Sequence, residues 1–464
     1  MPESGGPVRA LAHRDDRVTS RSLTEDALDI ARRHAGHNAL ITVDAEGALR
    51  EAWRADRRRA GRGPLHGVPV VVKDNIHVAG MPNTAGTPAL ADFVPRADAP
   101  VVSRLRAAGA LVLGKTNLHE LCMGVSGAES AAGAVRNAWA PDRLAGGSSA
   151  GTAVLVALGL PAGLGTDTGG SIRIPAALNG VCGLRPSLGR YPTDGVTPLS
   201  ATRDTVGPIA RTVADLAVLD SVLAGEPIGS VRGRPASVLR LGVPAEVTSG
   251  PCDRETLAAF DHALGRLRAV GVTVVDVGQL GLDGIERRVG LPITAFEARH
   301  GLTGYLQTYL PSLTLEGLVA AIAGPQVRRF FRTHVVPGSP GAVAQADYRA
   351  AITLGRARLL GQYRRVFRAH RLDALVFPST PRQAPPVGSG GPAGGDGWAA
   401  FEVFTRHTAA GSLIGLPGLT LPIPAPAGGL PVGLALDGPP GGDRLLLDIG
   451  RLLEDILAPL AAAG

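Results

Sequence analysis

Lysine is almost absent from this chain. The sequence has 47 lysine and arginine residues, and only Lys73 and Lys115 are lysines. Arginine stays protonated in proteins, whereas a buried lysine can lose its proton and serve as a base. A lysine retained in so arginine-rich a chain is therefore a candidate for general-base chemistry.

Cysteine and long apolar runs are also scarce. The three cysteines, Cys122, Cys182 and Cys252, are odd in number and far apart, which fits a reducing compartment better than a disulfide framework. No C-x-x-C motif or histidine cluster indicates a metal site, so we expect neither a metal ion nor a cofactor. No apolar run reaches membrane-spanning length, and the first residues lack the apolar core of a signal peptide. We therefore expect a cytoplasmic protein with no membrane partner.

The charge pattern gives little support to nucleic-acid binding. The net charge is +7, but the arginines are scattered among Asp and Glu apart from the run Arg57-Arg58-Arg59. Aromatic residues make up 4% of the chain and are not interleaved with basic residues as on a nucleic-acid platform. A composition of 45% hydrophobic and 19% charged residues is instead typical of a soluble globular enzyme.

Helices alternate with short apolar strands along the chain, which predicts the α/β class. Length alone would suggest about three domains, but no long linker interrupts the region that carries the candidate catalytic residues. We therefore expect a flexible segment over residues 1–20 and a single domain over residues 21–464, within which residues 283–371 form a mainly helical insertion or cap-like region.

Hydrophobic periodicity and turn residues place the individual elements. Strands are predicted over residues 68–72, 110–113, 239–244, 272–277 and 372–378, and near Leu419 and Val432. Helices are predicted from Ser22, over 45–59, from Asp98 as N-cap to 108, and over 149–160, 171–179, 212–223, 253–270, 398–408 and 443–457.

Two glycine turns carry the serines of greatest interest. The first is Gly146-Gly147-Ser148-Ser149, and the second is Thr168-Gly169-Gly170-Ser171. Glycines let the backbone approach a ligand closely, and successive N–H groups at a turn that opens a helix can point at one anion. The second turn thus predicts an oxyanion site beside Ser171 as nucleophile, although a serine in this position can also simply cap a helix.

A serine nucleophile needs a base, and the sequence favours Lys73 for that role. Lys73 follows the apolar run 68–72, and burial at the end of such a strand would lower its pKa. Lys115 is the second choice. His66, His77 and His119 lie in neighbouring segments, but none has an evident position relative to Ser171.

The segment 109–116 matches the P-loop pattern G-x-x-x-x-G-K-[ST], but we interpret the match as accidental. In a true P-loop the four middle residues form a turn around phosphate. Here they are Ala-Leu-Val-Leu, which reads as the strand itself, and Lys115 then has a structural role in the turn that follows.

Three segments together resemble the amidase signature family: Gly67–Asn75 around Lys73, the Gly-Gly-Ser-Ser turn, and Gly165–Arg173 around Ser171. The resemblance implies a mixed β-sheet flanked by helices and a Ser–cis-Ser–Lys triad. Ser171 would be the nucleophile, Ser148 the bridging serine with a cis peptide bond before it, and Lys73 the base. Ser149 is the rival for the bridging position. Within the family, residues 81–88 and 429–439 look most like those of indoleacetamide and mandelamide hydrolases.

The resemblance implies an amidase that forms an acyl-enzyme from a small primary amide, such as indole-3-acetamide or mandelamide. The N–H groups of Thr168, Gly169 and Gly170 would hold the oxyanion, and Asp167 with Arg173 would fix the turn. Two alternatives remain: the A subunit of a glutamyl-tRNA amidotransferase-like complex, and a non-catalytic binding protein. The expected partner is the amide substrate; a homodimer is one candidate for the oligomeric state.

Overall fold

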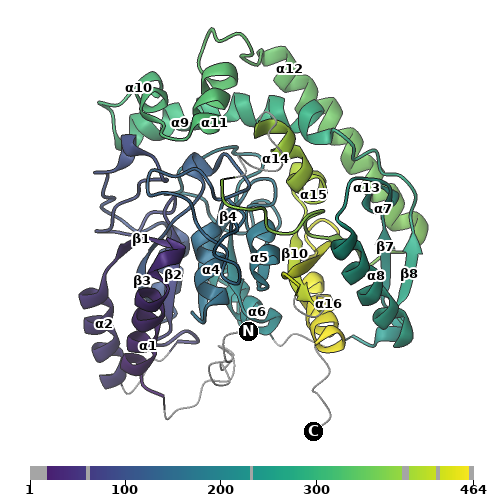
Figure 1. The fold of residues 1–464 in the computed structure, drawn as a ribbon, viewed down its shortest axis with the longest axis horizontal. Coiled ribbons are helices and arrows are strands. Elements are labelled where there is room, and N and C mark those ends of the chain that lie inside the picture. Colours follow the sequence, from purple (N-terminus) through teal and green to yellow (C-terminus); the bar gives the residue numbers. More distant parts are fainter. Residues whose placement is uncertain (1–17, 59–62, 230–233, 389–396, 425–428, 459–464) are drawn as a thin grey trace.

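A single mixed sheet organises the chain. The structure is a computed structural model that describes residues 18–58, 63–229, 234–388, 397–424 and 429–458. In these residues eleven strands form one sheet in the order β1-β3-β2-β4-β6-β5-β10-β11-β9-β7-β8, with helices on both faces (Figure 1). The predicted α/β class is therefore confirmed. The expected flexible segment 1–20 lies outside the described residues as far as residue 17.

The first half of the sheet is built around three parallel strands. It contains β1 (Leu40–Val43), β3 (Leu111–Thr116), β2 (Pro69–Lys73), β4 (Ala162–Asp167), β6 (Thr205–Ala210) and β5 (Cys182–Arg185). Strand β2 pairs in parallel with β3 and β4, and Val72 lies opposite Leu164. Because carboxyl ends of parallel strands meet at one edge of a sheet, the residues that end β2 and β4 lie side by side there.

The second half comes from the C-terminal part of the chain. It contains β10 (Gly418–Ile423), β11 (Val432–Asp437), β9 (Ala374–Pro378), β7 (Arg240–Val243) and β8 (Thr273–Asp276). The two halves join where β5 pairs antiparallel with β10, with Gly183 opposite Thr420. Residues far apart in the sequence therefore meet at the centre of the sheet.

Alternating side chains of β2 show how the two faces are covered. Val71 packs in a core with α1 (Ser20–Arg33), α2 (Ala45–Arg57) and α4 (Ala150–Ala157). Val70 and Val72 instead belong to the large core formed with α3 (Pro100–Ala107), α6 (Val213–Ala224), α8 (Arg254–Ala269) and α16 (Asp443–Leu457). Helix α5 (Arg173–Asn179) packs against α4 through Ile172 and Ala176.

A run of helices follows β8, as expected for residues 283–371. It contains α9 (Leu291–Tyr309), α10 (Leu315–Ala321), α11 (Pro325–Phe330), α12 (Gln345–Ala350) and α13 (Ala357–His370), with π-helical turns at Glu286–Gly290, Phe331–Val335 and Ala351–Arg356. Figure 1 shows α9 to α12 along the upper edge of the view and α13 continuing down the right side. A separate core, including Leu302 and Leu318, packs α9, α10 and α11 against the loops after β2 and β3. Helix α13 joins the large core through Leu359 and Tyr363. A cap-like function for these helices stays a prediction.

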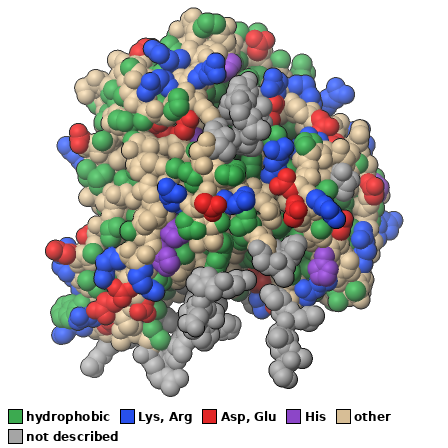
Figure 2. All heavy atoms as spheres, viewed as in Figure 1, with side chains coloured by type: hydrophobic (Ala, Val, Ile, Leu, Met, Phe, Trp, Pro, Cys, Tyr) green, Lys and Arg blue, Asp and Glu red, His purple; other side chains and the backbone are tan. Residues whose placement is uncertain are grey.

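The remaining features of the fold are three short helices and a surface of mixed charge. Helices α7 (Ala245–Ser249), α14 (Gly397–Thr405) and α15 (Ala409–Leu413) are short. Figure 2 shows basic and acidic side chains interspersed over the visible face, in keeping with the scattered arginines of the sequence. Among the described helices, none combines the length and the apolar character needed to cross a membrane.

Four strands were not predicted from the sequence, namely β1, β4, β5 and β6. Strand β4 contains Gly163 and Gly165, and glycine disfavours strands, so hydrophobic patterning did not mark it. The structure gives these glycines a purpose. A Cβ atom at Gly163 would lie 2.6 Å from the Thr152 side chain, and one at Gly165 would lie 2.6 Å from Ser149 Oγ. The two glycines therefore let α4 lie directly against β4.

Three predicted boundaries were wrong for local reasons. Helix α1 begins at Ser20 because Thr19, not Ser22, is the N-cap, with Thr19 Oγ1 accepting the Ser22 N–H. Asp98 does not cap α3, since its carboxylate accepts the Ala79 N–H instead. Strand β3 continues through Lys115 to Thr116, so Lys115 lies within the strand rather than in a turn after it.

Candidate active site

Lys73 ends β2 and lies fully buried among hydroxyl groups. Its Nζ atom is 2.7 Å from Ser148 Oγ and 2.7 Å from Thr166 Oγ1. In the described residues no carboxylate forms an ion pair with Lys73. Burial dominates and lowers the pKa of Lys73 below its usual 10.5, although the neighbouring Cys122 thiol and the more distant Asp167 and Asp204 oppose the shift. These surroundings shift the amine toward its neutral form.

The first glycine turn brings both of its serines to the end of β4. The peptide bond between Gly147 and Ser148 is cis, as the family resemblance implied. Ser148 Oγ contacts Lys73, whereas Ser149 Oγ donates to Thr166 O (3.1 Å) and accepts the Thr166 N–H (3.2 Å). The two serines thus have different partners: Ser148 contacts the amine, and Ser149 ties the start of α4 to β4.

The second glycine turn lies next to the first. The Ser149 N–H donates to Ser171 O over 3.0 Å, which joins the two serine turns directly. Ser171 follows Gly170, whose φ of +135° is accessible mainly to glycine, and Ser171 as a residue is 6% exposed. Ser171 is therefore largely enclosed but still within reach of a small ligand.

A cluster of buried ion pairs supports the second glycine turn. Asp167 forms ion pairs with Arg173 (3.1 Å) and Arg185 (3.1 Å), and all three side chains are fully buried. Burial alone would raise the pKa of Asp167, but the two guanidinium groups hold it well below its usual range. The expected Asp167–Arg173 pair is present, and Arg185 completes it.

The Asp167 carboxylate also accepts a hydrogen bond from one of the N–H groups expected to bind the oxyanion. Its Oδ1 atom accepts the Gly170 N–H over 2.8 Å, and its Oδ2 atom accepts the Ile172 N–H over 3.2 Å. An N–H group that already donates to a carboxylate can form only a weak hydrogen bond to a second anion. Gly170 is therefore a weaker candidate than the sequence suggested, and the greater part of an oxyanion site would fall to Thr168 and Gly169.

Lys115 is equally buried but has an anionic partner. Its Nζ atom is 2.9 Å from Asp74 Oδ1 and donates to Pro82 O (3.0 Å) and Asn83 Oδ1 (3.1 Å). Asp74 in turn accepts the Thr84 hydroxyl (2.5 Å) and N–H (3.0 Å). Burial lowers the pKa of Lys115, and Asp74 opposes that shift. The pair anchors the loop after β2.

The three histidines weighed as bases have other partners. His66 Nε2 is 3.0 Å from Ala55 O, and His77 Nε2 is 2.7 Å from Tyr305 OH. His119 Nδ1 is 3.5 Å from Ser126 Oγ, and burial, assisted by Lys73, lowers its pKa to about 3. These contacts point to structural roles for the three side chains.

Sequence reasoning overlooked several neighbours of Lys73. Asn75 Nδ2 donates to Thr166 Oγ1 (3.2 Å), and Cys122 Sγ is 3.8 Å from the same oxygen. A small cavity adjoins them, lined also by Thr168 and Asp204, whose carboxylate accepts the Thr168 hydroxyl (2.5 Å). Thr166 lies inside a quoted motif and could have been noticed; Cys122 and Asp204 carry no local signal.

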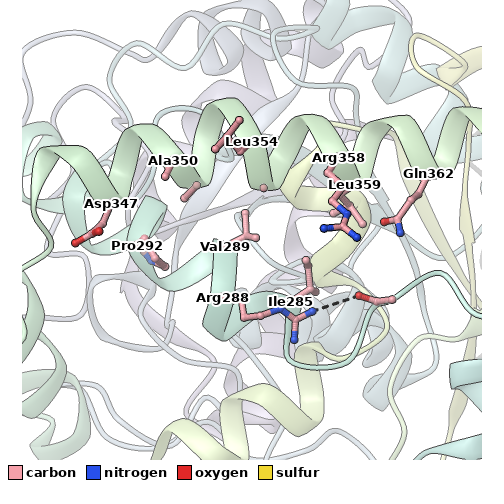
Figure 3. A pocket seen from close by; sticks show the side chains of 13 residues that line it. Ile285, Arg288, Val289, Pro292, Asp347, Ala350, Leu354, Arg358, Leu359 and Gln362 are labelled. Atoms are coloured by element: carbon pink, nitrogen blue, oxygen red, sulfur yellow. Dashed lines mark hydrogen bonds between the residues drawn. The ribbon is translucent and has the colours of Figure 1, made fainter.

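A second concavity contains none of the predicted site residues. It lies between the π-helical turn Glu286–Gly290 and the continuous helix of α12 and α13, and its lining includes Val289 and Arg288 from the turn and Arg358 and Leu359 from the helix (Figure 3). Reactive groups gather instead at the ends of β2 and β4. That edge of the sheet is the candidate active site.

Comparison with known proteins supports this location. A family model described as Amidase matches residues 22–447. The chain belongs to the amidase family. It is a hydrolase that acts on amide C–N bonds, and the alternative of a non-catalytic binding protein is thereby set aside.

Relatives of this amidase cover nearly its whole length. It is 41% identical to the mandelamide hydrolase of Pseudomonas putida over 463 residues, covering 96% of this chain and 89% of the relative. It is 37% identical to the indoleacetamide hydrolase of Agrobacterium vitis, covering 97% of each. A crystal structure of an amidase superposes with a TM-score of 0.82 at 39% identity, covering 95% of this chain and 97% of that one.

Proposed function

We propose that this amidase hydrolyses a small primary arylacetamide, such as indole-3-acetamide or mandelamide, to the carboxylic acid and ammonia. The observation that carries the proposal is the contact of Lys73 with Ser148, 2.7 Å apart, in a buried site without a carboxylate partner in the described residues. The names of the two relatives support the substrate class.

In the first half of the reaction Ser171 is the nucleophile. Its Oγ attacks the amide carbonyl carbon while its proton passes to Ser148, and the proton of Ser148 passes to neutral Lys73. A hydroxyl both donates and accepts, so Ser148 can relay the proton. The N–H groups of Thr168 and Gly169 stabilise the negative charge on the carbonyl oxygen, with at most a minor share from Gly170.

In the second half of the reaction the same groups transfer protons in the opposite direction. Protonated Lys73 returns its proton through Ser148 to the leaving nitrogen, and ammonia departs. Water then attacks the acyl-enzyme, its proton follows the same route, and Ser171 is regenerated with release of the acid. No cofactor enters this sequence of steps, because each one is a proton transfer or an acyl transfer.

The nucleophile is tested by Ser171→Ala. We expect a loss of activity of about 10⁴-fold or more, because coupled catalytic residues fail together. Intact mass spectrometry should show a fluorophosphonate adduct on the wild-type protein and none on the variant. Retained activity, or an adduct on another serine, would show that Ser171 is not the nucleophile.

The relay is tested by comparing two adjacent serines. Ser148→Ala should remove most of the activity of a folded protein, whereas Ser149→Ala should remove less, since the Ser149 hydroxyl bonds to the Thr166 backbone and the substitution keeps the Ser149 N–H. The reverse order would assign the bridging role to Ser149.

The substrate class is tested by a panel of primary amides assayed for ammonia release. Indole-3-acetamide and mandelamide should be turned over far faster than glutamine. Preferential glutamine hydrolysis, together with co-purifying partner chains, would instead support the amidotransferase A subunit.

A further inference from the structure

A closed ring of hydrogen bonds runs through the peptide group between Gly169 and Gly170. On one side the Gly170 N–H donates to Asp167 Oδ1 (2.8 Å). On the other side the Gly169 carbonyl accepts the hydroxyl of Thr408 (2.7 Å). Because a peptide group is planar, fixing both ends fixes the orientation of the whole unit.

Arg173 completes the ring. Its guanidinium donates to the Thr408 carbonyl (3.2 Å) and to Asp167 (3.1 and 3.2 Å). It also donates to Ser412 Oγ (2.6 Å), whose own hydroxyl donates back to the Thr408 carbonyl (3.0 Å). Thr408, Arg173 and Asp167 are all fully buried, so water does not compete for these bonds.

The Thr408 hydroxyl is closely packed against the turn. A Cβ atom at Gly170 would lie 2.3 Å from Thr408 Oγ1. The Thr408 hydroxyl therefore reaches the Gly169 carbonyl only because residue 170 has no side chain. The Thr408 hydroxyl also lies 3.5 Å from Thr405 O, but its short bond is the one to the Gly169 carbonyl.

We infer that Thr408 is a positioning residue that sets the direction of the oxyanion-binding N–H groups. This inference rests on the proposed function of the second glycine turn. If the Gly169 carbonyl loses its donor, the Gly169–Gly170 peptide is held only at its Gly170 N–H. A change in ψ of Gly169 or φ of Gly170 then alters how this peptide is oriented relative to the adjoining peptides, which carry the N–H groups of Gly169 and Ser171. The Thr408 hydroxyl bonds to backbone carbonyls of Gly169 and Thr405, so in this inference it acts through the geometry of the turn.

The decisive variant is Thr408→Val, which keeps the branched shape and removes the hydroxyl. Loss of a direct oxyanion donor lowers kcat by about 10²–10³-fold, so a residue that only orients the donors should lower it by about 10–100-fold. KM for a primary amide should change by less than about twofold, because ground-state binding does not depend on the oxyanion. Thr408→Ser keeps the hydroxyl and should stay within about threefold of the wild-type kcat.

A second measurement distinguishes a change in the orientation of the oxyanion-binding N–H groups from a general loss of order in the active site. Phenylacetaldehyde should add to Ser171 as a hemiacetal, with the Ser171 proton passing to the aldehyde-derived oxygen or to Lys73, and that oxygen occupies the oxyanion site. Phenylacetate, the product acid, forms no such adduct. Thr408→Val should weaken inhibition by the aldehyde about 10–100-fold and leave inhibition by phenylacetate nearly unchanged.

Thr152→Val is the matched control. Thr152 is fully buried in α4. Its hydroxyl donates to Leu164 O of β4 (3.2 Å) and lies 2.7 Å from Thr116 Oγ1, so it also bonds a backbone carbonyl but one outside the second glycine turn. It should lose a similar amount of stability, measured by thermal melting, but retain kcat and aldehyde inhibition. If Thr408→Val does not fold, the pair Thr408→Ala and Thr408→Ser gives the same comparison.

Two results would overturn the inference: a Thr408→Val protein with kcat and aldehyde inhibition within about twofold of wild type, or a Thr408→Ser protein as impaired as Thr408→Val, since then the hydroxyl is not what matters. Failure of the proposed function looks different. In that case Ser171→Ala itself keeps its activity and its sensitivity to the aldehyde.

Discussion

Lys73 and Lys115 lie on the adjacent parallel strands β2 and β3, and both side chains are fully buried. Their partners differ. Lys115 contacts the Asp74 carboxylate at 2.9 Å, whereas Lys73 contacts two hydroxyl groups at 2.7 Å. An ion pair compensates part of the cost of burying a charge, and hydroxyl groups compensate much less. The comparison teaches that partners, rather than burial alone, decide whether a lysine supports the fold or is free to exchange a proton.

The largest effect is expected for Lys73→Arg. Arginine keeps a positive charge and cannot supply a neutral amine, so the variant should be as inactive as Lys73→Ala, with a loss of about 10⁴-fold or more. The ammonia-release rate on one good amide measures this, with folding checked by circular dichroism. A folded Lys73→Arg protein with near-wild-type turnover would mean that Lys73 is not the base.

Lys115→Met should affect stability rather than chemistry. Removing one member of a buried ion pair leaves Asp74 unpaired and should lower the free energy of unfolding by about 3–5 kcal/mol, measured by urea denaturation. The double variant Lys115→Met/Asp74→Asn should recover part of that loss. The folded fraction should keep kcat within about tenfold of wild type. A stable but inactive Lys115→Met protein would contradict the contrast between the two lysines.

A smaller, graded effect is expected from pH. Because burial lowers the pKa of Lys73, its neutral form is complete above that lowered pKa and is lost as pH falls through it. The rate, kcat/KM, should therefore rise with pH and reach its plateau below 10.5, the usual lysine value. A rate that keeps rising through the ordinary lysine range would show that Lys73 is not depressed, and a flat profile would remove it from the mechanism.

The sequence identified the chemistry better than the architecture around it. Lysine scarcity, the two glycine turns and the family resemblance together singled out Lys73, Ser148 and Ser171, and the contact between Lys73 and Ser148 is present in the structure. Their site assignments stay proposals. Strand β4 was not predicted because Gly163 and Gly165 interrupt the hydrophobic pattern of a strand. The same two glycines allow α4 to pack directly against β4.

Other features could not have been predicted from local patterns. Nothing near Gly170 in the sequence indicates that its N–H belongs to Asp167, since that depends on the rotamer of a side chain held by two arginines. Thr408 lies 239 positions from Gly169 and has no motif of its own. Contacts of this kind arise from tertiary packing and become visible only once the sheet is assembled.

The ring through Thr408 has a consequence for biosynthesis. A chain emerging from the ribosome contains Lys73, Ser148 and Ser171 long before residue 408 is made, and β5 must wait for β10 to complete the centre of the sheet. Contacts of such long sequence separation form late and slowly. Nascent or truncated chains that end before Thr408 should therefore lack amidase activity, because the second glycine turn and the proposed nucleophile Ser171 would not yet be held by the complete fold.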